Sequence, residues 1–239
     1  MTTTLTRAKN YLREYFEDWS LWDKLWSLIF TGVIVALSIV WKDSWYGLIC
    51  SLTGIFCVIL AAKGRIFNYY IGIINVLLYA FISYQNKYYG EVMLNAFYFF
   101  PMQFVGLAIW LRHKNPRIID TVKVRFLSNK YRFLWAAICA IGTVSYGFVL
   151  KKLGGNLPFL DSSSTVLSVI AMILMSWRYM EQWILWIIVD IVSVILWLVV
   201  MLNGGNDITI LLMWTAYLVN AIYGLIVWIR MYKMQEISA

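Results

Sequence analysis

The stretch Trp183-Ile-Leu-Trp186-Ile-Ile-Val-Asp190 places a carboxylate inside an apolar run that is long enough to cross a bilayer. At 3.6 residues per turn, Trp183, Trp186 and Asp190 share one helical face across about two turns. An acid at this depth costs roughly 2.5–3.5 kcal/mol on insertion scales and usually faces a bundle interior or a wet cavity. We therefore interpret this face as functional. The alternative is an acid that a neighbouring helix satisfies, beside two tryptophans that only fill space.

The composition indicates a membrane protein. Hydrophobic residues make up 62% of the 239 residues, whereas ordinary soluble domains have about 45–50%. A membrane-crossing helix needs about 20 predominantly apolar residues, and the apolar runs of this chain are spaced accordingly. The sequence predicts an all-α polytopic membrane protein with eight spans, at about 25–41, 45–62, 66–84, 91–111, 133–150, 163–177, 182–202 and 207–229.

The basic residues support an even number of spans. The net charge is +8, but most basic residues lie between apolar segments, where they set membrane orientation rather than bind nucleic acid. With eight spans, one face of the membrane receives all 20 basic residues except Lys42, Lys87, Lys151 and Lys152. By the positive-inside rule, both termini are predicted to be cytoplasmic. The interleaved aromatic and charged residues of 11–26 predict an amphipathic helix at the membrane surface.

The sequence offers no set of residues for catalysis, a metal or a cofactor. Cys50, Cys57 and Cys139 are scattered through apolar runs, and His113 stands alone in a basic loop. There is no P-loop, and no second acid or histidine lies near Asp190 in the sequence. We therefore predict that the chain is not an enzyme.

An internal repeat relates the two halves of the chain. Gly106-Leu-Ala-Ile-Trp110-Leu-Arg112 and Gly224-Leu-Ile-Val-Trp228-Ile-Arg230 are identical at four of seven positions, 118 residues apart. One span earlier, Asn68-Tyr-Tyr-Ile-Gly-Ile-Ile-Asn75 aligns with Trp183 to Asp190 at an offset of 115. Four crossings separate equivalent spans, so the repeat is parallel, as in transporters that bind substrate between their halves. The glycines are expected to allow close helix packing.

Polar side chains of both halves form the predicted substrate site. Amides offer donors and acceptors, indoles stack on flat rings, and a carboxylate matches a cation. The alternative for each polar residue is interhelical hydrogen bonding, worth about 0.6 kcal/mol on average. The predicted site comprises Asn68, Asn75, Gln103, Trp183, Trp186, Asp190, Tyr217 and Asn220.

Residues 161–194, with the pattern Trp183, Trp186 and Asp190, resemble the PnuC family of bacterial vitamin transporters, and the segment from Asn68 to Asn75 is similar too. The resemblance implies a SWEET-like 3+1+3 arrangement of helices, and facilitated uptake of nicotinamide riboside across the bacterial inner membrane by alternating access. It also implies a homotrimer and a cytoplasmic kinase that sustains flux by phosphorylating the vitamin. Asp190 stands where some relatives have Asn, so thiamine or riboflavin, or proton coupling through Asp190, remain alternatives.

These inferences divide the chain into six parts. An amphipathic cytoplasmic N-terminus (1–24) precedes an extra transmembrane helix (25–41). The first three-helix repeat (45–111) is joined to the second (161–230) by a basic loop and linker helix (112–160). A cytoplasmic tail (231–239) follows.

Overall fold

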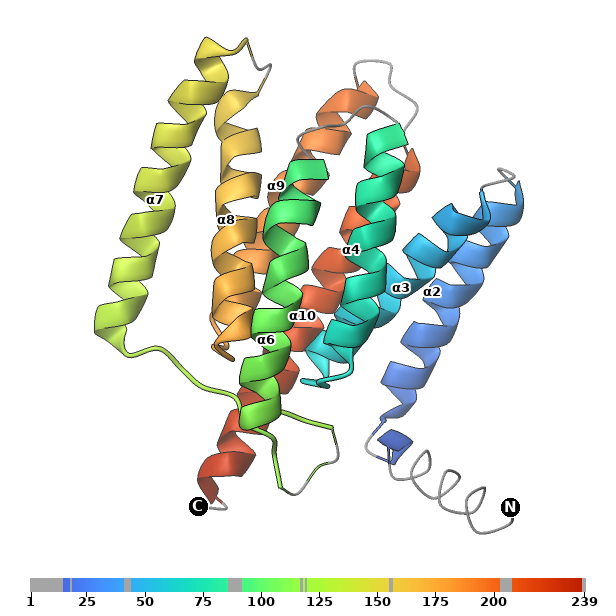
Figure 1. Cartoon of the computed structure of the whole chain (residues 1–239), viewed down its shortest axis with the longest axis vertical. Coiled ribbons are helices and arrows are strands. Elements are labelled where there is room, and N and C mark those ends of the chain that lie inside the picture. Colours follow the sequence, from blue (N-terminus) through green and yellow to red (C-terminus); the bar gives the residue numbers. More distant parts are fainter. Residues whose placement is uncertain are drawn as a thin grey trace. The chain divides into compact units, whose positions relative to one another are not determined.

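The computed structural model describes residues 15–17, 19–40, 44–85, 92–116, 118, 120–154, 157–202 and 208–237. These residues are almost entirely helical (Figure 1). The helices are α2 (Leu21–Val40), α3 (Trp45–Ala62), α4 (Asn68–Gln85), the π-helix η1 (Leu94–Phe99), α6 (Phe100–Arg112), α7 (Asn129–Lys152), α8 (Pro158–Ser176), α9 (Gln182–Leu202) and α10 (Ile208–Ile237).

A helix stands at each of the eight predicted spans, which confirms the all-α membrane fold class. Within the described residues, α2, α3, η1 with α6, α7 and α8 are each long and apolar enough to cross a bilayer. Helix α10 runs on through the predicted tail as far as Ile237. No glycine or proline follows Gly224 to end it. Of the predicted surface helix at residues 11–26, residues 11–14 and 18 lie outside the described residues, and residues 21–26 form the start of α2.

The chain divides into two compact units. Unit 1 comprises residues 1–61 and 65–122, and unit 2 comprises residues 62–64 and 123–239. In unit 1, α4 packs against η1 and α6. In unit 2, α8 contacts both α7 and α9, and α9 contacts α10. The apolar core of unit 2 is a cluster that joins the connecting loop, α7, α8 and α9: Leu127, Cys139, Leu167, Ile170, Leu174 and Val189.

The turns before α4 and α9 are built alike. In unit 1, the N–H of Arg65 donates to the carbonyl of Leu60 at 2.8 Å. In unit 2, the N–H of Tyr179 donates to the carbonyl of Leu174 at 2.9 Å. Both bonds close a turn of the same size at the end of a helix, and the equivalent residues are 114 positions apart.

Each turn also pairs with part of the segment that we name the connector, residues 120–128. The N–H of Ile66 donates to the Asp120 carbonyl at 2.8 Å in unit 1, and the N–H of Met180 donates to the Arg125 carbonyl at 2.9 Å in unit 2. These isolated backbone pairings give irregular segments the partners that buried backbone groups require. The start of α4 and the start of α9 are therefore each fixed by backbone hydrogen bonds.

The register of the repeat is 114 residues at these turns, so the offset of 115 that the sequence predicted is wrong. At the offset of 114, Tyr69 is the counterpart of Trp183. The Tyr69 ring lies over Gly106 of α6, and the Trp183 ring lies over Gly224 of α10. Asn75 is not the counterpart of Asp190; the residue that corresponds to this acid is Val76. Matching polar residues set the predicted register, whereas ring-to-glycine packing sets the real one.

Candidate functional site

Trp183 packs against α10 in unit 2. A Cβ atom added at Gly224 would lie 2.7 Å from the Trp183 ring, so the indole occupies space that only glycine leaves free. The Trp228 ring meets it edge-on, with centroids 6.0 Å apart. Trp183 is only 4% exposed, and its Nε1 has no hydrogen-bond partner among the described residues. This packing identifies Trp183 as the contact that sets the distance between α9 and α10.

Trp186 and Asp190 lie further along α9. Trp186 is partly buried and packs against the apolar cluster of unit 2. Asp190 is 3% exposed, and within the part of the chain that the structure describes its carboxylate makes no hydrogen bond or ion pair. Burial of an acid without a protein partner is costly and is typical of functional positions in membranes.

Asn220 and Tyr217 lie on the neighbouring helix, α10. Since Trp183 lies beside Gly224 and the two helices run antiparallel, positions later on α9 lie beside positions earlier on α10. This geometry places Asn220 near the level of Trp186, and Tyr217 near the level of Asp190. Asn220 is buried, and the Tyr217 ring packs edge-on against Trp214. The five predicted site residues of unit 2 thus lie on two adjacent helices.

Two of the three predicted site residues of unit 1, Asn68 and Asn75, make local hydrogen bonds. Asn75 Nδ2 donates to the Cys50 carbonyl on α3 at 2.8 Å, which is the interhelical hydrogen bond that the sequence left as an alternative. Asn68 is fully buried, and its Nδ2 donates to the Arg65 carbonyl in the turn before α4. Gln103 lies against Gly72, where an added Cβ would come within 2.5 Å of Oε1. The amides of Asn68 and Asn75 therefore stabilise unit 1.

Gln182 is a polar residue that sequence reasoning missed. It is the first residue of α9 and the counterpart of Asn68, and its exposed fraction is 0%. Neither Nε2 nor Oε1 has a hydrogen-bond partner within the described residues. An orphaned buried amide costs about 1–3 kcal/mol. The correct repeat register, which pairs it with Asn68, is the signal that could have identified it.

Helical spans, an internal repeat and polar side chains buried in them define a multi-pass membrane transporter. A family model described as nicotinamide mononucleotide transporter matches residues 44–230. The chain is 40% identical over 225 residues to the nicotinamide riboside transporter PnuC of Neisseria mucosa, covering 92% of this chain and 86% of that protein. It is 30% identical over 230 residues to the Haemophilus influenzae protein of the same name, covering 96% and 99%.

A solved structure described as the vitamin B3 transporter PnuC matches with a TM-score of 0.79 and 39% identity, over 94% of this chain and 97% of that one. The chain belongs to the nicotinamide mononucleotide transporter family, the family of PnuC. The resemblance noted in the sequence is thereby confirmed, as is the prediction of a transporter rather than an enzyme.

Proposed function

We propose that this protein carries nicotinamide riboside across the bacterial inner membrane. The observation that carries the proposal is Asp190, a buried acid without a protein partner among the described residues, on the helix that also presents Trp186. Nicotinamide riboside has a flat pyridinium ring with a positive charge. A carboxylate with an indole nearby suits such a ring through charge pairing and cation–π contact. The names of the relatives from Neisseria and Haemophilus agree with this substrate.

The proposed binding residues follow the sequence prediction except at Trp183, which was predicted to bind substrate and which packs against Gly224 and Trp228. Trp186, Asp190, Tyr217 and Asn220 on α9 and α10 are the principal contacts, and Trp183 holds the two helices together. The contributions of Asn68, Asn75 and Gln103 from unit 1 stay predictions. Transport proceeds by alternating access without energy coupling, and phosphorylation by a cytoplasmic kinase sustains inward flux. Both termini are cytoplasmic, and the protein acts as a homotrimer.

The test is isothermal calorimetry of purified protein with nicotinamide riboside, thiamine and riboflavin, repeated on Trp186→Ala and Asp190→Ala. We expect nicotinamide riboside to bind and Asp190→Ala to lose at least about tenfold in affinity, since truncating one partner of a buried charge pair costs about 2–5 kcal/mol. Trp186→Ala should also lose about tenfold or more, since a desolvated cation–π contact is worth about 2 kcal/mol. Ser193→Ala, a buried polar change on the same helix, is the matched control. Failure of well-folded protein to bind nicotinamide riboside would remove the proposal.

A second candidate is uptake of thiamine, which is also flat and cationic and so fits the same acid and indole. The calorimetry separates the two ligands directly. Proton coupling through Asp190 is a further alternative, because a membrane-buried acid is a common proton relay. It predicts that a protonophore abolishes uptake into proteoliposomes that carry a pH gradient, whereas a facilitator is unaffected.

A further inference from the structure

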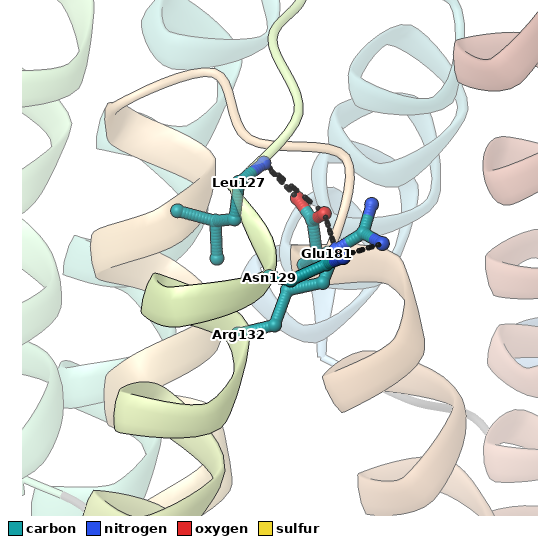
Figure 2. Close-up of polar contacts among 4 residues, drawn as sticks. All are labelled: Leu127, Asn129, Arg132 and Glu181. Atoms are coloured by element: carbon teal, nitrogen blue, oxygen red, sulfur yellow. Dashed lines mark hydrogen bonds and ion pairs between the residues drawn. The ribbon is translucent and has the colours of Figure 1, made fainter.

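Besides the backbone hydrogen bonds, the charged side chain of Glu181 holds the start of α9. Both Glu181 carboxylate oxygens accept the N–H of Leu127, at 3.1 and 3.2 Å. One of them also accepts Arg132 Nε at 2.8 Å (Figure 2). The Glu181 side chain is 9% exposed, while that of Arg132 is 44% exposed. Glu181 directly precedes α9, and its carboxylate joins the start of this helix to the connector and to α7. These bonds are strong, because hydrogen bonds to ionised groups are about twice as strong as neutral ones.

The turn that carries Glu181 is strained at Arg178. Its φ is +67°, a conformation that glycine adopts readily and other residues do not. The counterpart in the turn before α4 is Gly64, with φ +64°. Arg178 Nη1 donates to the Lys123 carbonyl at 3.0 Å, and its own carbonyl accepts the N–H of Arg125 at 2.8 Å. Burial and the nearby Arg125 lower the pKa of Arg178 to about 10, so the guanidinium stays charged at neutral pH.

Unit 1 provides an independent observation. Asp120 Oδ2 in the connector accepts the N–H of Phe67 at 3.1 Å. Phe67 is the counterpart of Glu181, so in each unit a carboxylate joins this turn position to the connector. In unit 1 the connector supplies the acid, and in unit 2 the turn supplies it. The same bond made from opposite partners indicates that the link itself is required.

We propose that Glu181 is a positioning residue for transport: it fixes the start of α9 to α7, so that the helix with Trp186 and Asp190 moves together with α7 during the cycle. This proposal rests on the transport function proposed above. Glu181 lies nine residues before Asp190, a distance of about 13 Å along the helix, so it does not touch the substrate. It therefore affects the rate of transport and not the affinity for substrate.

The experiment compares Glu181→Gln, Glu181→Ala and Arg132→Gln with the wild type in proteoliposomes, using uptake of labelled nicotinamide riboside per folded molecule and calorimetry on the same samples. Loss of the charge-assisted bond is expected to lower the maximal rate roughly tenfold in all three variants. The dissociation constant should change less than about twofold. Glu181→Ala, which also orphans the Leu127 N–H, should be the slowest. Lys130→Gln, which removes an exposed cation from the same end of α7, is the control.

Three results would overturn the proposal. The first is an unchanged transport rate in Glu181→Gln and Arg132→Gln. The second is a loss of rate in Lys130→Gln as large as that in the Glu181 variants. The third is a fall in the affinity of the Glu181 variants as large as their fall in rate, and any one of the three suffices. If Glu181→Ala does not fold, Glu181→Gln still decides, because it keeps an acceptor for the Leu127 N–H. If the wild type itself neither binds nor transports nicotinamide riboside, the proposed function fails. Wild-type transport with unaffected variants refutes only the role of Glu181.

Discussion

The two repeats share a packing motif and differ in the chemistry that surrounds it. Tyr69 lies over Gly106 and edge-on to Trp110 in unit 1, as Trp183 lies over Gly224 and edge-on to Trp228 in unit 2. The ring and glycine occupy equivalent positions in both. The scaffold is therefore the same, although one ring is a phenol and the other an indole.

Away from this motif, the polar groups are distributed unequally. Asp190 corresponds to Val76, and Trp186 corresponds to Gly72. The buried amides of unit 1 bond to the backbone of their own unit, whereas Gln182 and Asp190 in unit 2 have no such bonds among the described residues. A repeat can thus conserve packing while its buried polar groups differ: of the Asn68 amide only the Oδ1 atom lacks a partner among the described residues, whereas both polar atoms of the Gln182 amide and the Asp190 carboxylate lack one. This asymmetry is why unit 2 supplies the principal contacts in the proposed site.

The largest expected effect comes from giving unit 2 the unit 1 residue, with Asp190→Val. We expect nicotinamide riboside affinity to fall at least about tenfold, since the pyridinium charge loses its partner. Thermal stability should rise, because the variant removes a buried carboxylate that costs roughly 2.5–3.5 kcal/mol. Calorimetry and thermal unfolding in detergent measure the two effects. Retained binding in the variant would place the site elsewhere.

The next effect tests whether the ring-over-glycine contact is equivalent in both units. Gly106→Ala and Gly224→Ala should each destabilise the protein by about 1–3 kcal/mol, because the new methyl group would overlap the Tyr69 or Trp183 ring. Gly32→Ala is the matched control: an added Cβ there meets nothing within 4 Å, so stability should be unchanged or slightly higher. Unfolding midpoints report all three. An unchanged unfolding midpoint for Gly224→Ala would show that the ring-over-glycine contact is not equivalent in the two units.

A smaller effect is expected at the two left-handed positions. Gly64→Ala should cost about 1 kcal/mol, because alanine disfavours positive φ. Arg178→Gly relieves the same strain and loses the bond to the Lys123 carbonyl, each about 1 kcal/mol, so the net change should be close to zero. Chemical denaturation of both variants and the wild type under one set of conditions measures these changes in stability. A large loss for Arg178→Gly would mean that the guanidinium bond outweighs the backbone strain.

The smallest effect is expected for Gln182→Leu, which replaces the amide with an apolar side chain of similar size. Because the amide has no partner among the described residues, its removal should leave stability unchanged or raise it by about 1 kcal/mol. Gln182→Asn, which copies the unit 1 residue, should raise stability by no more than Gln182→Leu does. Thermal unfolding checks both. Marked destabilisation by leucine would show that the amide has a partner, such as a buried water.

The helices could be predicted from the sequence because the length of an apolar run and the spacing of basic loops are local properties. Close helix packing at the glycines followed from the same reasoning, since small residues allow close approach. The aromatic rings that lie over Gly106 and Gly224 were not predicted. The repeat register could not be fixed in this way. Asn75 and Asp190 were matched because both are polar, but the position of a ring over a glycine depends on the neighbouring helix.

The link between Glu181 and the connector was also beyond the sequence. Glu181 and Leu127 are 54 residues apart, and their bond depends on how the connector pairs with the turn. Arg132 contributed only to the charge bias that predicts orientation. Gln182 lies at the end of a span, where a glutamine is usually solvated, so its complete burial is a tertiary property.

The edge-on pair of Trp183 and Trp228 has an optical consequence. Two indoles with centroids 6.0 Å apart couple their electronic transitions, and the sign and size of the resulting near-ultraviolet circular dichroism depend on their mutual angle. Because one indole belongs to α9 and the other to α10, the pair is an intrinsic gauge of the angle between these helices. Adding nicotinamide riboside to unlabelled protein and subtracting the Trp228→Phe spectrum would record their movement.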